Sequence, residues 1–381
     1  MKRIAIIGST GSIGKQTLAV IKRNPEAFEV VSLAGGNNTR AFLEQVKEFK
    51  PKIATLINEV PTENITGTTF YFGENAFTNA ITTDADIVVV ALVGFKGIIA
   101  VLDAIEKGKT VALANKESLV VGGELVMQKA KEKGVKLLPI DSEHSAVWQS
   151  LGFDETKPFN KIILTCSGGA FRDEPMENFS TLTAKDALKH PNWNMGDKIT
   201  IDCATLVNKG FEVIEAKWLF NTDFDKIDVL IHRESIIHSM VEYADGSVIA
   251  QLGTPTMETP ISLALSYPER INCDIHRIDF KKASKLTFAE YNEEKFPCLK
   301  LVVDAGKKGG IYPAVINGAN EVAVSAFLDG KINYADIYTV LKGAFNSIAE
   351  NPTPNCLKDL IKADEFGRTS AKEIIERINA N

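Results

Sequence analysis

The fold is decided by Ile4-Ala5-Ile6-Ile7-Gly8-Ser9-Thr10-Gly11-Ser12-Ile13-Gly14, near the start of the chain. A short apolar run leads into a glycine turn, and the helical pattern that follows continues through Ile21. Glycines at such a turn let the backbone approach a pyrophosphate, which binds the N–H groups at the start of the helix. The stretch predicts the first strand, turn and helix of a dinucleotide-binding domain, although a glycine turn without a ligand has the same pattern.

The alternation of strands and helices continues to residue 140. Apolar runs predict strands at 29–33, 53–57, 86–92, 110–114 and 135–140, and helical patterns lie at 39–49, 97–107 and 119–133. The segment after residue 57 has no clear pattern. Strands that alternate with helices indicate a parallel sheet, whose ligands bind at the carboxyl ends of the strands.

The second strand is followed by Gly36, Asn37, Asn38 and Arg40. A site for NAD usually has an acidic residue here, which binds the ribose hydroxyl, and this segment has none. The amide and guanidinium donors favour NADP instead. A turn that caps the next helix explains the same residues, and the two roles are compatible.

Two later strands end in charged residues. Asp141 and Glu143 would project from one face of a strand and could hold a hard cation. The alternative is that Asp141 or Ser142 caps the following helix. Lys116 could contact a phosphate or a substrate oxygen, and Glu117 could contact the nicotinamide end of a cofactor or cap the next helix.

The second half contains two loops with features of a binding site. Ser167-Gly168-Gly169 follows an apolar run at 162–165 and is either an anion cradle or a simple turn. Residues 190–196, His-Pro-Asn-Trp-Asn-Met-Gly, cannot be regular structure. This loop is either a lid that excludes water from a hydride transfer or a loop packed permanently on the core.

A helix is expected to open at residue 202 and to continue through residues 206–216. Asn208, Lys209 and Glu212 share one of its faces. The group is either an ordinary surface ion pair or, together with Asp141 and Glu143, an all-oxygen site for Mg²⁺ or Mn²⁺.

The remaining patterns complete an α/β fold class. Residues 235–243 and 247–252 predict a β-hairpin, and 315–328, 334–350 and 369–379 predict helices. We expect a Rossmann-like parallel-sheet domain at residues 1–141, which binds NADPH. A central α+β catalytic domain is expected at 142–275, with a lid near 185–197. A linker at 276–297 and a C-terminal helical bundle at 298–381 follow.

The composition excludes several classes of protein. The net charge of −6 argues against a general nucleic-acid or membrane-surface binder. Five cysteines without a C-x-x-C pair indicate reduced thiols rather than a disulfide framework or a zinc ribbon. The chain begins directly with a strand pattern, and its longest apolar stretch is interrupted by Gly94 and Lys96. We therefore expect a cytoplasmic protein.

The ordered set of motifs resembles the 1-deoxy-D-xylulose 5-phosphate reductoisomerase family. The motifs are 8–14 (Gly-Ser-Thr-Gly-Ser-Ile-Gly), 114–118 (Ala-Asn-Lys-Glu-Ser), 141–144 (Asp-Ser-Glu-His), 167–169 (Ser-Gly-Gly), 190–196 and 208–212 (Asn-Lys-Gly-Phe-Glu). The resemblance implies an NADPH-dependent and metal-dependent rearrangement and reduction of 1-deoxy-D-xylulose 5-phosphate to 2-C-methyl-D-erythritol 4-phosphate. It also implies a homodimer whose interface lies in the central domain.

The resemblance further implies a role for each matching residue. It places the metal on Asp141, Glu143 and Glu212, the phosphate on Ser167, Asn208 and Lys209, and the sugar oxygens on Ser142, Lys116 and His190. The NADPH contacts are Thr10, Gly11, Ser12, Ile13, Gly36, Asn37, Asn38, Asn115, Glu117 and Gly196, with Trp193 and Met195 as the lid. Two positions depart from the family. Cys203 replaces a common phosphate-binding serine with a weaker donor, and Asn37 replaces a lysine of some members, which leaves Arg40 as a substitute.

Two other functions remain open on the sequence. A semialdehyde-dehydrogenase-like oxidoreductase shares the early glycine pattern and would use Cys166 as a thiol nucleophile. An NADP-binding regulatory protein would bind the cofactor without turnover.

Overall fold

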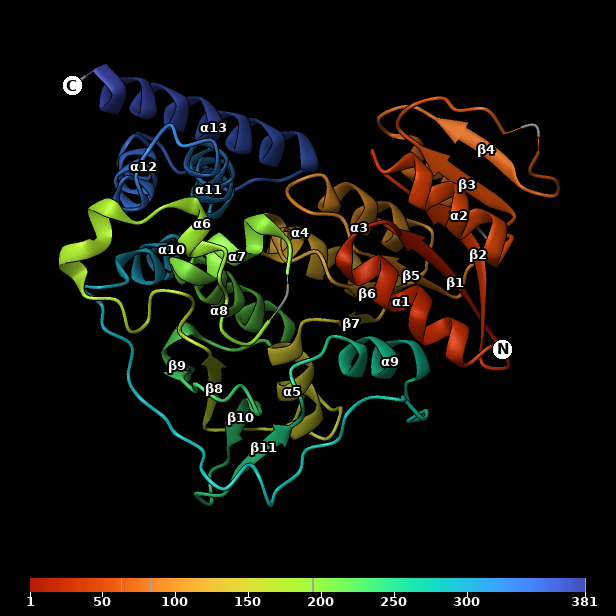
Figure 1. The fold of residues 1–381 in the computed structure, drawn as a ribbon, viewed down its shortest axis with the longest axis horizontal. Helices are drawn as coiled ribbons and strands as arrows, with labels where there is room; N and C mark the ends of the chain where they lie inside the picture. Colours follow the sequence, from red (N-terminus) through yellow and green to blue (C-terminus); the bar gives the residue numbers. More distant parts are fainter. Residues whose placement is uncertain (63, 83, 194, 381) are drawn as a thin grey trace. The chain divides into compact units, whose positions relative to one another are not determined.

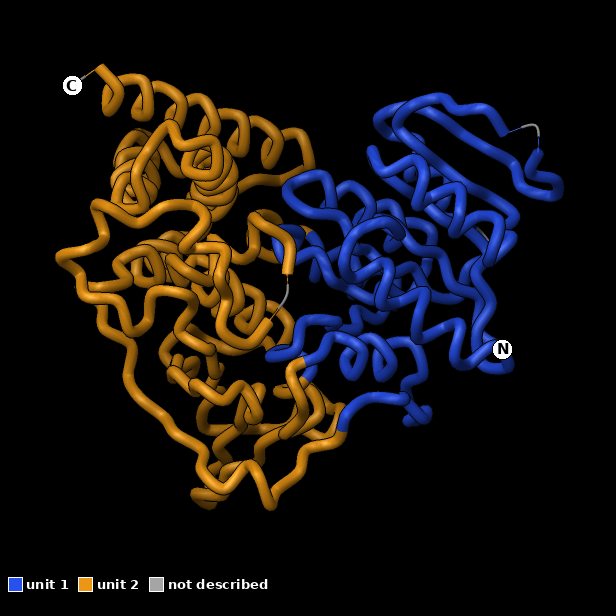
Figure 2. The backbone as a smooth tube through the Cα atoms, in the orientation of Figure 1, with its two compact units in different colours: residues 1–118, 126–145, 256–276 blue, residues 119–125, 146–255, 277–381 orange. Residues whose placement is uncertain are grey.

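The computed structural model describes residues 1–62, 64–82, 84–193 and 195–380 (Figure 1). The chain divides into two compact units (Figure 2), one of residues 1–118, 126–145 and 256–276 and the other of residues 119–125, 146–255 and 277–381. We call them unit 1 and unit 2. The functional boundaries predicted at residues 141, 275 and 297 stay predictions.

Unit 1 is built on a parallel sheet of strand order β4-β3-β2-β1-β5-β6-β7. Because β2 and β5 lie on opposite sides of β1, the strand order reverses at β1, where open α/β sheets bind ligands. Edge strand β4 was not predicted, because its side chains are half exposed and carry no buried apolar run. The strands are β1 (Lys2–Ile7), β2 (Phe28–Ala34), β3 (Ile53–Leu56), β4 (Thr69–Phe72), β5 (Ile87–Val90), β6 (Thr110–Leu113) and β7 (Leu137–Pro139).

The predicted helices of unit 1 are confirmed. They are α1 (Ser12–Arg23), α2 (Thr39–Phe49), α3 (Gly97–Glu106) and α4 (Glu117–Lys133), of which residues 119–125 belong to unit 2, with a short 3-10 helix, η1 (Ala76–Ala80). Helix α9 (Glu258–Ser266) comes from later in the chain and packs against α1. An ion pair between Arg23 and Glu258 joins α1 to α9.

Unit 2 contains a mixed sheet of order β11-β10-β8-β9, in which only the β8–β9 pair is parallel among the described strand pairs. The predicted hairpin is confirmed as β10 and β11. The strands are β8 (Lys161–Cys166), β9 (Ile227–Ile231), β10 (Ile237–Glu242) and β11 (Val248–Leu252), and helix α5 (Ser142–Ser150) precedes them.

The helix expected from residue 202 onward is wrong, because the chain forms two helices there. Helix α7 (Asp197–Ala204) ends before Leu206, and α8 (Val207–Leu219) begins after it. Leu206 has a left-handed φ of 60° and is 2% exposed. Its side chain packs in an apolar cluster with Cys166, Phe296 and Leu299. Contacts with residues far away in the sequence therefore stabilise the break between α7 and α8.

The C-terminal region forms the predicted helical bundle. Its helices are α10 (Pro297–Lys308), α11 (Tyr312–Leu328), α12 (Tyr334–Asn346) and α13 (Leu357–Ala380). Helix α13 begins well before the predicted residue 369, and its Gly367 lies against the backbone of Val315, where a Cβ would come within 2.2 Å of the carbonyl oxygen. The glycine at this position therefore allows α13 and α11 to pack closely. No helix in the described part of the chain is both long and apolar enough to span a membrane.

Candidate active site

Close backbone packing shapes the glycine turn between β1 and α1. Gly8 has a φ of +99°, and a Cβ there would lie 2.6 Å from the Ala91 carbonyl oxygen. A Cβ on Gly14 would lie 2.3 Å from the Gly8 carbonyl oxygen. Gly11 is the N-cap of α1, so no side chain of its own competes for the first N–H groups of the helix. Residues 10–13 therefore present backbone donors suited to a phosphate.

The segment after β2 caps the next helix. Asn38 Oδ1 accepts a hydrogen bond from the backbone N–H of Ala41 at 3.2 Å. The Arg40 side chain is 92% exposed and pairs with Glu44 at 3.3 Å. The capping role is thus confirmed for Asn38, and it leaves the amide nitrogen of that residue as a donor.

Asn115 ties together the carboxyl ends of β5 and β6. Its buried amide donates to the carbonyl oxygens of Leu92 at 2.9 Å and Gly94 at 3.1 Å, and to Glu117 Oε2 at 2.9 Å. Its Oδ1 accepts from the backbone N–H of Ser118 at 3.0 Å. The Asn115 side chain thereby holds together the carboxyl ends of β5 and β6, next to Lys116.

Asp141 stands at the start of a helix rather than on a strand. The predicted strand to residue 140 ends at Pro139, and α5 begins at Ser142, so the argument from strand alternation is wrong. Asp141 Oδ1 accepts from the backbone N–H groups of Glu143 at 3.0 Å and His144 at 3.2 Å, which confirms the capping role. Its Oδ2 accepts from Lys116 Nζ at 2.7 Å. The ammonium favours the ionised carboxylate.

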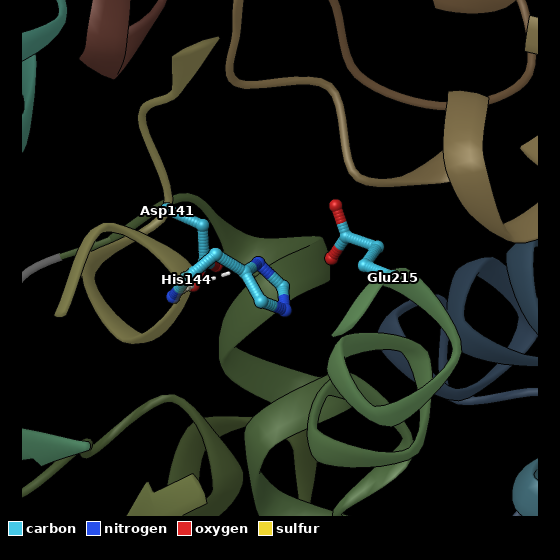
Figure 3. Close-up of side chains that lie close together, drawn as sticks. All are labelled: Asp141, His144 and Glu215. Carbon is cyan, nitrogen blue, oxygen red and sulfur yellow. Dashed lines mark hydrogen bonds and ion pairs between the residues drawn. The ribbon is translucent and has the colours of Figure 1, made fainter. Parts of the chain in front are cut away.

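No role for His144 was predicted from the sequence. Its side chain is fully buried, and its Nδ1 lies 3.3 Å from Asp141 Oδ1. Figure 3 shows both residues at the start of α5, and also Glu215 on α8. Glu215 is 3% exposed and follows Glu212 by nearly one helical turn. Asp141 and His144 are three residues apart in the sequence, and so are Glu212 and Glu215. This spacing places the two members of each pair on one side of a helix, and it is the sequence pattern from which His144 and Glu215 could have been predicted.

The polar group on α8 is buried, so the alternative of a surface ion pair is wrong. The side chains of Lys209 and Glu212 are 3% and 2% exposed and form an ion pair. Asn208 Nδ2 donates to Glu212 Oε1 at 2.5 Å. Helix α10 packs against α8 at Gly210, where a Cβ would come within 2.7 Å of Val302. The structure confirms that the three predicted residues act as one group.

The Ser167-Gly168-Gly169 turn bonds to the predicted lid loop. Ser167 Oγ lies 3.0 Å from His190 Nε2 and also accepts from the backbone N–H of Gly169. His190 Nδ1 accepts from the backbone N–H groups of Asn192 at 3.2 Å and Trp193 at 3.0 Å. Because Nδ1 accepts, the proton of the neutral ring is on Nε2, and His190 donates to Ser167.

The charge state of His190 gives a testable prediction. Burial, with a contribution from the Arg172 guanidinium, lowers the pKa of His190 to about 4. We expect the ring to stay neutral, as the Nε2–H tautomer, from pH 8 down to about 5.5. Nitrogen NMR of the labelled protein, assigned with His190→Gln, measures this directly. A titration midpoint between about 6 and 7 would contradict it.

The loop predicted at 190–196 is irregular in its described residues, 190–193 and 195–196. The wider lid near 185–197 also includes residues 185–187 of helix α6 (Ala184–Ala187) and the first residue of α7. Asn192 Nδ2 donates to the Arg233 carbonyl oxygen at 2.7 Å and to Ser235 Oγ at 2.6 Å. The Trp193 ring lies 6.1 Å from the His238 ring on β10. Trp193 and Met195 are half-buried. The loop is therefore anchored through Asn192, and its role as a lid stays a prediction.

Two cysteines differ in their surroundings. Cys203 is half-buried near the end of α7, and a Cβ on Gly169 would lie 2.4 Å from the Cys203 carbonyl oxygen. The Ser167 turn and the end of α7 are thus in backbone contact. Cys166 is 9% exposed and belongs to an apolar cluster with Leu206 and Phe296. Apolar surroundings disfavour a thiolate, so Cys166 is poorly suited to be a nucleophile.

The carboxylates fit a hard divalent cation. Asp141 and Glu143 in unit 1 and Glu212 in unit 2 offer oxygen atoms, which Mg²⁺ and Mn²⁺ prefer. Asp141 and Glu212 each form an ion pair with a lysine.

Family comparisons cover nearly the whole chain. Residues 4–123 match the model described as 1-deoxy-D-xylulose 5-phosphate reductoisomerase. Residues 137–220 and 252–370 match the two C-terminal-domain models of that enzyme. The chain is 48% identical to the 1-deoxy-D-xylulose 5-phosphate reductoisomerase of Chlorobaculum tepidum and 47% identical to that of Listeria monocytogenes, with 98% of this chain and 100% of each relative covered.

Solved structures agree with the sequence comparisons. One is the enzyme from Zymomonas mobilis in complex with NADPH, which is 38% identical, with a TM-score of 0.91 over 98% of this chain and 99% of that one. Another is a reductoisomerase in complex with NADPH, fosmidomycin and magnesium, also 38% identical, with a TM-score of 0.93 over 99% of both chains. The predicted fold class is confirmed. The chain belongs to the 1-deoxy-D-xylulose 5-phosphate reductoisomerase family.

Proposed function

We propose that this protein converts 1-deoxy-D-xylulose 5-phosphate to 2-C-methyl-D-erythritol 4-phosphate, a step of non-mevalonate isoprenoid synthesis, with oxidation of NADPH and with a divalent cation. It is an NADP-dependent oxidoreductase and isomerase. The proposal follows from family membership over the full chain.

One structural observation carries the proposal. The glycine turn follows β1, and Lys116 and Asp141 follow β6 and β7 of the same parallel sheet. Since the carboxyl ends of parallel strands meet at one edge, the dinucleotide turn and the paired Lys116 and Asp141 lie at one edge of unit 1. A hydride donor and a charged group for substrate oxygens are what the reaction requires.

Asp141, Glu143 and Glu212 are the proposed ligands of the cation. When bound, Mg²⁺ or Mn²⁺ supplies Lewis-acid polarisation of the substrate's carbonyl and hydroxyl oxygens. Lys116 donates to Asp141, and Lys209 donates to Glu212.

The substrate is held by residues from several segments of the chain. Ser167, Asn208 and Lys209, with Cys203 as a weaker contact, bind the phosphate, which the charge of Lys209 favours. The sugar oxygens are bound by Ser142, Lys116 and His190. His190 acts as a neutral donor through its Nε2–H, because Nδ1 already accepts two backbone N–H groups.

NADPH is bound along the edge of the unit 1 sheet. Its pyrophosphate lies on the backbone donors of residues 10–13, and its 2′-phosphate is bound near residues 36–38. Asn115, Glu117, Met195 and Gly196 complete the contacts, and Trp193 with Met195 covers the site and excludes water.

Two further properties belong to the proposal. A homodimer is favoured by edge strand β11, whose Val248 and Ile249 are each 48% exposed. An exposed apolar edge strand is a ready pairing surface for a second copy. We also place the protein in the cytoplasm, in keeping with its reduced cysteines.

A direct test separates this function from a Cys166-dependent dehydrogenase. We expect EDTA to abolish NADPH oxidation with the sugar phosphate, and Cys166→Ala to keep most of it, because the thiol packs in the apolar cluster. Both results are read from the absorbance of NADPH, and excess Mg²⁺ should restore the EDTA-treated sample. Activity that survives EDTA but is lost in Cys166→Ala would favour the dehydrogenase.

A further inference from the structure

The junction between α7 and α8 connects most of the proposed phosphate site. Cys203 lies just before it, and Asn208 and Lys209 lie just after it. Gly169, from the Ser167 turn, is in contact with the backbone of Cys203. The position of this junction therefore sets the relative positions of Cys203, Asn208 and Lys209, and the Ser167 turn packs against it through Gly169.

Helix α11 of the C-terminal bundle holds the α7 side of the junction. Asn320 Nδ2 donates to Asp202 Oδ1 at 2.7 Å, and Lys198 Nζ lies 2.9 Å from Asp202 Oδ2. Asn320 is 0% exposed and Asp202 is 2% exposed. A buried carboxylate needs such partners, so the loss of the amide would be costly. The bond ties residue 202 to a helix that lies more than a hundred positions away in sequence.

Helix α12 holds the junction at a second point. Tyr334 Oη donates to the Ala204 carbonyl oxygen at 2.8 Å. The Tyr334 ring lies edge-on to Phe171, which follows the Ser167 turn, at 4.8 Å between ring centroids. Burial, with a contribution from Cys298, raises the pKa of Tyr334, so the hydroxyl remains a donor.

We propose that helices α11 and α12 position the phosphate-binding residues of the active site through Asn320 and Tyr334, which hold the α7–α8 junction. This gives the C-terminal bundle a role in substrate affinity. Asn320 and Tyr334 act through Asp202 and Ala204 and are positioning residues. The inference rests on the proposed function.

Two variants on one helix test the inference. Asn320→Leu removes the donor to Asp202. Asn317→Leu is the matched control, because Asn317 is equally buried. Among the described residues its amide bonds only within the C-terminal helices, to Glu321 at 3.1 Å and Asp364 at 3.3 Å. Both variants should melt at lower temperature than the wild type. Only Asn320→Leu should raise the KM for the sugar phosphate, about tenfold, and weaken inhibition by inorganic phosphate in parallel.

The KM for NADPH should change by less than about twofold in Asn320→Leu, because the cofactor turn is not altered, and kcat should change by a smaller factor than the KM for the sugar phosphate. Asn320→Asp combined with Asp202→Asn reverses the donor and the acceptor, and should recover most of the sugar-phosphate KM. A purely structural role would give the same KM in Asn320→Leu and Asn317→Leu, which would overturn the inference.

A further variant covers the case in which Asn320→Leu does not fold. Tyr334→Phe removes only a hydroxyl group and should raise the same KM about threefold or more. A wild-type KM in folded Tyr334→Phe would then overturn the inference. If the wild-type protein itself shows no turnover, the proposed function is refuted instead. The failure of the inference and the failure of the proposed function can therefore be told apart.

Discussion

Replacement of Glu212 by glutamine is expected to lower kcat/KM for the sugar phosphate by about a thousandfold or more, because it removes a charged ligand from the proposed cation site. Glutamine has nearly the same size, and its carbonyl can still accept from Lys209 or Asn208, so the buried group keeps its shape. NADPH affinity should stay within about twofold, since the cofactor turn lies in unit 1. Steady-state rates at several Mg²⁺ concentrations and calorimetric titration with NADPH measure both effects.

Asp364→Asn is the matched control for Glu212→Gln. Asp364 is also a buried carboxylate, 5% exposed, and it accepts from Arg368 Nε at 2.6 Å within the C-terminal helices. This control should lower stability and leave kcat/KM within about threefold. Equal rates in Glu212→Gln and wild type would contradict the role of Glu212. A non-catalytic NADP-binding regulator would bind NADPH in every variant and form no product in any.

Replacement of Gly14 by alanine should disable the cofactor turn and destabilise the protein. The added Cβ would lie 2.3 Å from the Gly8 carbonyl oxygen and 2.5 Å from Ser9 Cα. Both are backbone atoms, so the turn and the start of α1 would have to move apart. We expect a loss of about 3 kcal/mol in the free energy of unfolding, near the upper end of ordinary overpacking costs, and at least about a tenfold loss of NADPH affinity. Urea unfolding and NADPH titration measure the two losses.

Gly36→Ala controls for the loss of a glycine in the same unit. A Cβ there would meet nothing within 4 Å, so we expect the free energy of unfolding to change by less than about 0.5 kcal/mol. If Gly14→Ala matches the wild type in both stability and NADPH affinity, the close packing of the turn is not what shapes the cofactor site.

The buried ion pair on α8 is better explained by function than by stability. Removing Lys209 and Glu212 from water has a large desolvation cost, which their mutual attraction often does not repay. An apolar pair of the same volume would pack on α8 with less cost. The proposed binding of a cation by Glu212 and of a phosphate by Lys209 explains why both charged side chains are kept at this position.

The sequence was sufficient to predict structure that depends on local pattern. The strand, glycine turn and helix of residues 4–21 were predicted correctly, because buried parallel strands are continuously apolar and the turn needs its glycines. The same holds for the β10–β11 hairpin. The sharing of a helix face by Asn208 and Glu212 follows from helix periodicity alone.

Features that depend on distant contacts could not be predicted. A leucine in the left-handed region, as at Leu206, has no local signal, because its apolar cluster supplies the compensation. The burial of Lys209 and Glu212 has no local signal, because the same spacing of charges is common on solvent-exposed helix faces. Gly367 carries no local signal for a helix, and its close contact with the Val315 backbone explains why a glycine stands there. Asp141 was assigned to a strand because apolar runs do not mark where a strand ends.

The most direct test of the proposed function is one assay of the purified wild-type protein. NADPH absorbance is followed with 1-deoxy-D-xylulose 5-phosphate, with and without Mg²⁺, and the product is identified by NMR. We predict NADPH oxidation only when both the sugar phosphate and the cation are present, with 2-C-methyl-D-erythritol 4-phosphate as the product. A folded sample that binds NADPH but does not oxidise it under these conditions would contradict the proposed function.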